Sequence, residues 1–238
     1  MTFDPLSRWT RGPRGPRRAS FPSLAALMTV GLVMTACDPG EPPAEMEEME
    51  DPAAEPEGVS EEQDQFWASL QELCGTALSG GVEAEEAIED PIEDREMIMH
   101  VRVCHDDEIQ IPVHVETEEG DWNRSRTWVV TREDTGLRLK HDHRYEDGEE
   151  EETTWYGGDT EDPGTAQRQQ FHADEYTADL IPEAATNVWT MEIEPGERFT
   201  YQLVREGTDR MVRWSWDLDD TVEPPPAPWG HEDVEPTH

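Results

Sequence analysis

Two histidines, His141 and His143, are the side chains whose type and spacing most clearly suggest chemistry. They stand in residues 137–145, where apolar or aromatic residues alternate with charged ones. Because the side chains of a strand alternate between its two faces, both histidines continue the apolar stripe begun by Leu137 and Leu139. The sequence therefore predicts an inward-facing polar patch. We interpret it as a ligand pocket, a metal site or a buried hydrogen-bond network.

Three aromatic side chains extend the patch if it is a pocket. Tyr145 shares the strand face of the histidines, Trp128 lies in the preceding β-rich run, and Trp214 lies in the last such run. An aromatic wall with a few polar groups is typical of small-molecule sites. The candidate pocket residues are therefore His141, His143, Tyr145, Trp128 and Trp214.

The metal interpretation takes His141 and His143 as ligands of one divalent ion. Imidazoles with carboxylates suit zinc or copper, and a third ligand would come from another histidine or from an acid such as Asp159. The pair does not form a strong motif such as H-E-x-x-H. No other cofactor and no catalytic residue is identified, because the sequence has no G-x-S-x-G, no phosphate-binding glycine loop and no EF-hand loop.

The charge of the chain excludes one class of partner. Its 238 residues include 57 acidic and 18 basic side chains, for a formal net charge of -39. Such a surface repels the phosphate backbone of nucleic acids. Lys140 is the only lysine, and the strand alternation places it on the outer face beside Asp142.

The N-terminal 36 residues are expected to be a lipoprotein signal peptide. Five arginines precede an apolar run at residues 24–36, which is shorter than the roughly 20 apolar residues of a membrane span. The run ends in Thr35, Ala36 and Cys37, which resembles a bacterial lipobox, with Met34 where leucine is usual. We therefore expect a lipid on Cys37 and a location in the bacterial cell envelope, facing the periplasm or the exterior. Ordinary cleavage near Ala36 is the alternative.

The number of cysteines, three, is consistent with export to the cell envelope and a lipid on Cys37. If Cys37 carries a lipid, Cys74 and Cys104 remain, and an oxidising compartment allows them to pair. We therefore predict a Cys74–Cys104 disulfide.

Composition divides the mature chain into three parts. Residues 37–60 are acidic and proline-rich, which predicts a disordered tether, and residues 221–238 are expected to be a disordered tail. Residues 61–220 form the folded domain. It begins with a helix, because Ser60 and Gln63 have the spacing of a capping box and apolar residues follow at helical spacing. Residues 75–95 are expected to be a loop with a short helical turn near 84–87.

The rest of the domain reads as a meander of short strands joined by turns. Short links between consecutive strands indicate antiparallel neighbours, and a sheet of this size tends to close. We therefore predict a mainly β fold, an up-and-down barrel of about 8–9 strands of lipocalin-like (calycin) type, with a two-sheet β-sandwich as the alternative. The predicted strands are residues 97–104, 109–115, 126–132, 137–145, 153–156, 167–173, 188–193, 199–205 and 211–218.

Two motifs, His141-Asp142-His143 and Gly157-Gly158-Asp159-Thr160, carry a resemblance that extends over about residues 65–218. Together with residues 99–104, 109–115, 124–128 and 187–189, they resemble a family of bacterial secreted proteins of unknown function. The resemblance implies export. It carries over no activity, fold or site.

Three function classes follow from these observations. The favoured one is a lipid-anchored envelope protein that binds a small molecule inside a barrel, with the membrane and that ligand as its partners. An enzyme that uses His141 and His143, with or without a metal, is the second. A structural envelope protein with a filled barrel and no ligand is the third.

Overall fold

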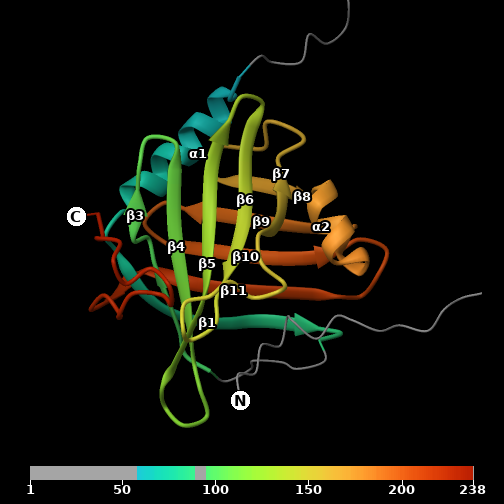
Figure 1. The fold of residues 1–238 in the computed structure, drawn as a ribbon. Helices are drawn as coiled ribbons and strands as arrows, with labels where there is room; N and C mark the ends of the chain where they lie inside the picture. The colour runs from blue at the N-terminus through green and yellow to red at the C-terminus, as the bar shows by residue number, and fades with distance from the viewer. Residues whose placement is uncertain (1–57, 89–94, 238) are drawn as a thin grey trace, which may run out of the picture. The chain divides into compact units, whose positions relative to one another are not determined.

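The computed structural model describes residues 58–88 and 95–237, which belong to one compact unit. Its antiparallel sheet closes into a barrel of ten strands, because β2 pairs with both β1 and β4 (Figure 1). The short strand β3 adds a second pairing to β4. The strands are β1 (Ala77–Glu86), β2 (Met97–His100), β3 (Val103–Cys104), β4 (Glu108–Glu116), β5 (Trp122–Glu133), β6 (Gly136–His143), β7 (Tyr156–Asp159), β8 (Arg168–Ala173), β9 (Asn187–Glu194), β10 (Arg198–Arg205) and β11 (Met211–Val222).

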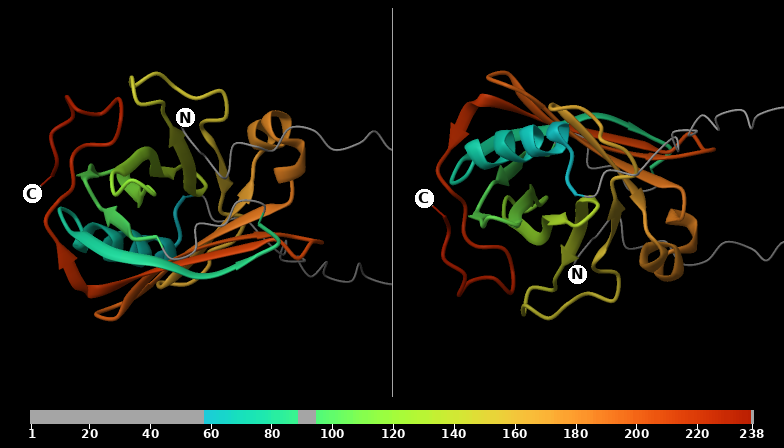
Figure 2. Two further views of the ribbon diagram at one scale, coloured as in Figure 1. Left: turned by 90° about the horizontal axis from the view of Figure 1, so that it is seen from below. Right: turned by 90° about the horizontal axis from the view of Figure 1, so that it is seen from above.

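Helix α1 (Glu61–Glu72) lies at one end of the barrel, and the view from above in Figure 2 shows it there. Its first turn is fixed by the predicted capping box, in which the Gln63 backbone N–H donates to Ser60 Oγ over 3.2 Å and Ser60 N donates to Gln63 Oε1 over 3.0 Å. One face is fully buried: Phe66, Trp67 and Leu70. Two short helices, α2 (Glu175–Leu180) and η1 (Pro182–Ala184), join β8 to β9.

The barrel and its register confirm the predicted fold class. Ile111 of β4, Trp128 of β5, His141 of β6 and Tyr156 of β7 are direct cross-strand partners, and all four are buried. Inward positions therefore form layers that cross the sheet from strand to strand. The barrel has ten strands where the sequence predicts eight or nine, and the alternative sandwich is wrong.

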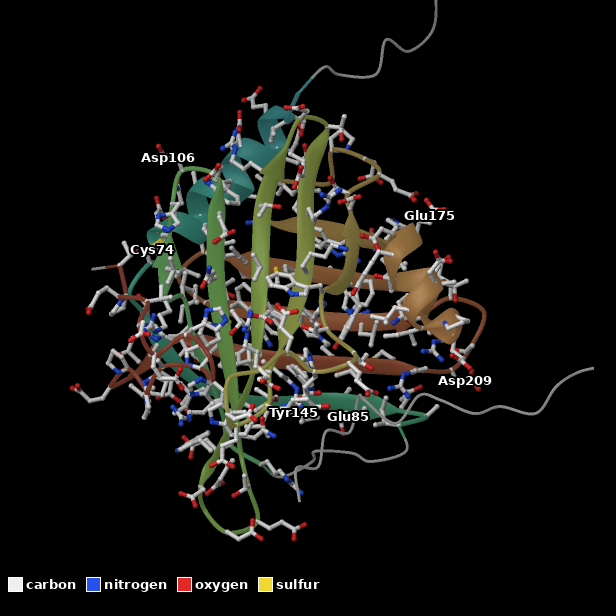
Figure 3. All side chains as sticks on the ribbon, in the orientation of Figure 1. Cys74, Glu85, Asp106, Tyr145, Glu175 and Asp209 are labelled. Atoms are coloured by element: carbon white, nitrogen blue, oxygen red, sulfur yellow. A yellow bond between two sulfur atoms is a disulfide. The ribbon has the colours of Figure 1, made fainter. Side chains whose placement is uncertain are left out.

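The Cys74–Cys104 disulfide is confirmed. It joins the segment after α1 to β3, with a separation of 30 residues along the chain. The bond therefore holds the helix end against the edge of the barrel wall. Cys74 is labelled in Figure 3.

One strand lies where the sequence predicts a loop. Residues of β1 pair along β11 as far as Glu86, so most of the predicted helical turn near 84–87 is strand. The sequence does not indicate this strand, because Gly80 and Gly81 interrupt its apolar pattern. A glycine is required at position 80, since a Cβ atom there would lie 2.3 Å from the Ser215 carbonyl oxygen. The fifth predicted strand is displaced as well: it runs over Tyr156–Asp159, not residues 153–156.

The C-terminal segment, residues 223–237, differs from the predicted disordered tail. It has no helix or strand, yet it lies outside the barrel ring against the wall (Figure 2). Trp229 is buried. Its backbone N–H donates to the Arg124 carbonyl oxygen over 3.1 Å, and the Thr237 backbone N–H donates to the Arg102 carbonyl oxygen over 2.8 Å. A buried tryptophan and these backbone bonds fix a segment whose composition alone would not.

Two predicted parts fall outside the described residues: the signal peptide, 1–36, and the tether up to residue 57. In the part of the chain that is described, no helix has the length and apolar character to cross a membrane.

Candidate functional site

The best-defined polar group inside the barrel is His141 of β6, which is 2% exposed. Its Nδ1 lies 3.1 Å from the carbonyl oxygen of Tyr156. A carbonyl oxygen only accepts, so Nδ1 carries the proton and Nε2 is an acceptor. Nε2 lies 2.8 Å from the hydroxyl of Tyr201, which therefore donates to it.

Burial keeps this histidine neutral. It is the main cause that lowers the pKa of His141 to about 3, and the neighbouring His143 lowers it further. Burial likewise raises the pKa of Tyr201 well above its ordinary value, so its hydroxyl stays protonated. The pair is therefore a neutral hydrogen-bond unit throughout the physiological pH range.

His143 continues the polar chain at the end of β6. Its Nε2 lies 3.0 Å from the hydroxyl of Tyr156, and its backbone N–H donates to Thr154 Oγ1 over 2.8 Å. Tyr156 thus joins the two histidines, using its carbonyl oxygen for His141 and its hydroxyl for His143. Arg126 is the cross-strand partner of His143 and is also buried. This end of β5 and β6 is opposite the end where α1 contacts Arg132.

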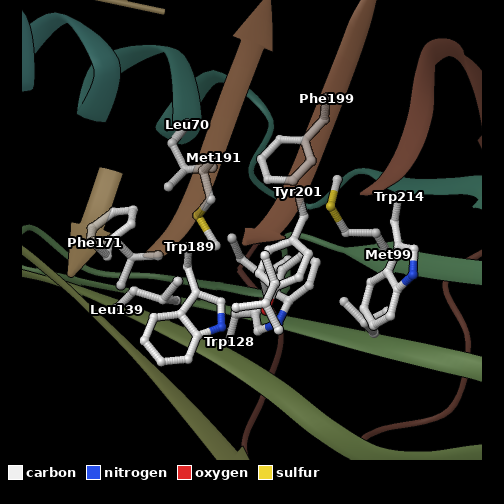
Figure 4. Packing of buried hydrophobic residues seen from close by; sticks show 14 of the residues in the cluster. Leu70, Met99, Trp128, Leu139, Phe171, Trp189, Met191, Phe199, Tyr201 and Trp214 are labelled. Carbon is white, nitrogen blue, oxygen red and sulfur yellow. The ribbon is translucent and has the colours of Figure 1, made fainter. Parts of the chain in front are cut away.

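Aromatic rings surround the polar chain. The ring of Trp128 stacks on Tyr201 with centroids 4.2 Å apart, and Tyr201 stacks on Trp214 at 5.3 Å. Trp189 approaches His141 from β9 at 5.3 Å. Figure 4 shows Trp128, Tyr201 and Trp189 among the apolar side chains of the interior. The site is thus an aromatic interior crossed by one line of hydrogen bonds.

The structure brings together four of the five predicted pocket residues: His141, His143, Trp128 and Trp214. Tyr145 does not join them, because it is 41% exposed (Figure 3). Strand β6 ends at His143, and the chain turns after Arg144, so the alternation that placed Tyr145 inward does not extend to it. The inward orientation predicted for Tyr145 is wrong.

The predicted metal ligands are occupied by other contacts. Both nitrogens of His141 are hydrogen-bonded, and Nε2 of His143 faces a tyrosine hydroxyl. Asp159, the suggested third ligand, pairs with Arg138 over 2.6 Å. Among the described residues, no group of three or more histidines, cysteines or acids is placed to hold a metal ion. Metal binding at the two histidines would require these contacts to be replaced.

A second polar group, on the outer face of β6, was missed. Asp142 is buried beneath the C-terminal segment, where its Oδ2 accepts from His231 Nε2 over 2.7 Å and from Arg144 Nε over 3.0 Å. Burial alone would raise the pKa of Asp142, but these hydrogen bonds outweigh it and hold the pKa below its ordinary value. Lys140 faces outward as predicted, although it pairs with Asp174 and not with Asp142.

The sequence does not predict that a third group of side chains comes together: His100 of β2, Arg102 of the link between β2 and β3, His114 of β4 and Arg124 of β5. The first three are buried although they lie on the outer face of the barrel. The C-terminal segment lies against this group, because the Thr237 and Trp229 backbone N–H groups donate to the Arg102 and Arg124 carbonyl oxygens, and the composition of that segment does not predict this position.

No family model, no curated protein and no solved structure matches the chain.

Proposed function

We propose that the chain is an exported, lipid-anchored protein of the bacterial cell envelope whose barrel binds a small molecule. The observation that carries the proposal is the hydrogen-bond chain of His141, Tyr201, His143 and Tyr156 inside an otherwise aromatic interior. Small-molecule sites combine a mostly apolar wall with a few placed polar groups, and this interior has that composition.

In this proposal the ligand enters the barrel at its polar end, where His143 and the Tyr156 hydroxyl lie. Helix α1 lies at the other end, where Asp64 pairs with Arg132. His143 and the Tyr156 hydroxyl stand at the last inward positions of β6 and β7 away from that end. A ligand that enters there meets a donor or acceptor first and aromatic rings behind it. The expected ligand is therefore a small, largely apolar molecule with one polar end.

Export and the lipid anchor rest on separate support. The disulfide indicates an oxidising compartment, because disulfides persist outside the cytosol. The arginine-rich start, the short apolar run and Cys37 support a lipoprotein signal peptide. The resemblance to bacterial secreted proteins agrees with them. Metabolic labelling with a fatty acid is expected to mark the wild-type protein and not Cys37→Ala; equal labelling of both would contradict the anchor.

The ligand proposal is tested by native mass spectrometry of the mature protein purified without denaturant. The expected result is a mass excess that disappears under denaturing conditions. A protein of unmodified mass, with no binding in a screen of apolar compounds, would contradict it.

A filled structural barrel is the second candidate. The stack of Trp128, Tyr201 and Trp214 favours it, because these rings already occupy much of the interior. The same mass measurement separates the two candidates. No observation favours an enzyme, since both nitrogens of His141 are engaged by Tyr156 and Tyr201.

A further inference from the structure

The strongest feature outside the barrel interior is the set His100, Arg102, His114 and Arg124, which we call the outer basic cluster. In β2 and β4, Met99 pairs with Val113 and Ile98 pairs with His114. The side chains of Met99 and Val113 belong to the interior core, so His114 and His100, at the alternate positions, point outward. The cluster is therefore separated from the polar chain of His141 by the sheet itself.

A β-bulge brings Arg124 to His114. Val113 pairs with Arg126 and Val115 pairs with Asn123, so the single residue His114 lies across from two residues of β5, Arg124 and Ser125. The Arg124 guanidinium also reaches the C-terminal segment, donating to the Ala227 carbonyl oxygen over 2.6 Å. Strand β5 thus places the positively charged Arg124 side chain at the edge of the outer basic cluster.

The C-terminal segment lies against the cluster, and three members of the cluster are buried. His114 is 0% exposed, His100 is 3% exposed and Arg102 is 7% exposed. Trp229 and Thr237 hold the covering segment by hydrogen bonds to the backbone of Arg124 and Arg102. The outer basic cluster therefore lies between the β-sheet and the C-terminal segment, which has no helix or strand.

Several buried polar atoms of this enclosure have no hydrogen-bond partner in the described part of the protein. They are both ring nitrogens of His114 and Nη1 of Arg102, all buried. A buried polar group without a hydrogen bond costs free energy, and a guanidinium costs more than a neutral group. Such groups in one enclosure indicate that a further polar species completes it.

The charges select the kind of species. Burial, with help from Arg124 and His100, lowers the pKa of His114 to about 3, and burial with Arg102 lowers the pKa of His100 to about 4. At pH 7 both imidazoles are neutral and each offers one N–H, while the two guanidinium groups are positive. Burial lowers the pKa of Arg102, and the negative charge of Glu235 in the C-terminal segment partly opposes this by raising it. A metal ion would meet two guanidinium charges, so the balance favours an anion.

We propose that the outer basic cluster binds a small oxyanion, such as inorganic phosphate or sulfate, beneath the C-terminal segment. Arg102 is the principal charged donor, His114 and His100 add one N–H each, and Arg124 contributes long-range attraction. The proposal is independent of the ligand inside the barrel.

The test uses the mature protein and inorganic phosphate at pH 7. Calorimetry is expected to show saturable binding, and the imidazole signals of His114 are expected to shift in NMR spectra. Arg102→Met should weaken binding by about ten- to a hundredfold, the effect of one charge-assisted hydrogen bond. Arg198→Met is the matched control and should bind phosphate as the wild type does. Among the described contacts, Arg198 of β10 forms an ion pair only with the exposed Glu194 at the end of β9.

A second variant covers the case in which Arg102→Met fails to fold. His114→Phe replaces an imidazole without partners by an apolar ring of similar shape, so the fold should persist while phosphate binding weakens. Absence of saturable binding of phosphate and sulfate would overturn the proposal. Wild-type affinity in His114→Phe and Arg102→Met would do the same, as would a His114 shift caused by zinc and not by phosphate.

Discussion

Replacing Tyr201 by phenylalanine tests the hydrogen-bond chain inside the barrel. The ring and its stack on Trp128, at 4.2 Å, are retained, and only the hydroxyl that donates to His141 Nε2 is lost. His141 is 2% exposed, so water does not replace the donor. Leaving one buried acceptor without a partner costs about 1–3 kcal/mol, and we expect the free energy of unfolding to fall by that amount.

Urea unfolding followed by far-UV circular dichroism measures this loss, with Tyr145→Phe as the control. Tyr145 is 41% exposed, and the loss of its hydroxyl should change stability by less than about 0.5 kcal/mol. A double-mutant cycle with His141→Leu isolates the pair, because the double variant no longer contains the unpaired nitrogen. A change below about 0.3 kcal/mol in Tyr201→Phe, or additive effects in the cycle, would refute the assigned bond.

Three further outcomes follow from the structure. Removing the Cys74–Cys104 bond by double alanine substitution should lower the free energy of unfolding by about 3.6 kcal/mol for a loop of 30 residues, measured by urea unfolding without reductant; a loss below about 1 kcal/mol would contradict it. Gly158→Ala should prevent barrel closure, because its Cβ would lie 1.6 Å from the His172 carbonyl oxygen. In the control Gly196→Ala the added Cβ meets no atom within 4 Å, so the free energy of unfolding should fall by only about 1 kcal/mol. Comparable thermal midpoints of the two variants would refute this difference. Burial lowers the pKa of His100, His114 and His141, so below pH 6.5 the unfolded chain takes up protons that the folded chain excludes. As the pH decreases from 6.5, the free energy of unfolding should therefore decrease by about 1.4 kcal/mol per pH unit for each of these histidines. Urea unfolding at pH 7 and at pH 5 measures this slope.

The features that the sequence predicts correctly have local signals. The capping box of Ser60 and Gln63 marks the start of α1, and the alternation around His141 marks an inward strand face. The disulfide follows from the cysteine count once Cys37 is assigned to a lipid. Each of these inferences needs only neighbouring residues or a count, and the barrel follows from the short links between strands.

The features that the sequence misses depend on contacts between distant segments. Strand β1 contains Gly80 because the Trp216 ring and the β11 backbone approach it, a constraint that its own neighbours do not reveal. His114 is buried on the face of the sheet where the C-terminal segment bonds to Arg102 and Arg124, and that segment is more than a hundred positions away. Its prolines and acids are typical of a disordered tail. In the structure His114 lies on the outer face of β4, and an outer position alone would predict exposure.

Ligand retention by two tyrosine variants tests the proposed function most directly. Native mass spectrometry of Tyr156→Phe, which loses the hydroxyl facing His143, should show less bound molecule than the wild type. Tyr145→Phe, whose hydroxyl lies outside the barrel, should retain as much as the wild type. Equal retention in both variants, or no bound molecule in the wild type, would contradict a binding site at the polar end of the barrel.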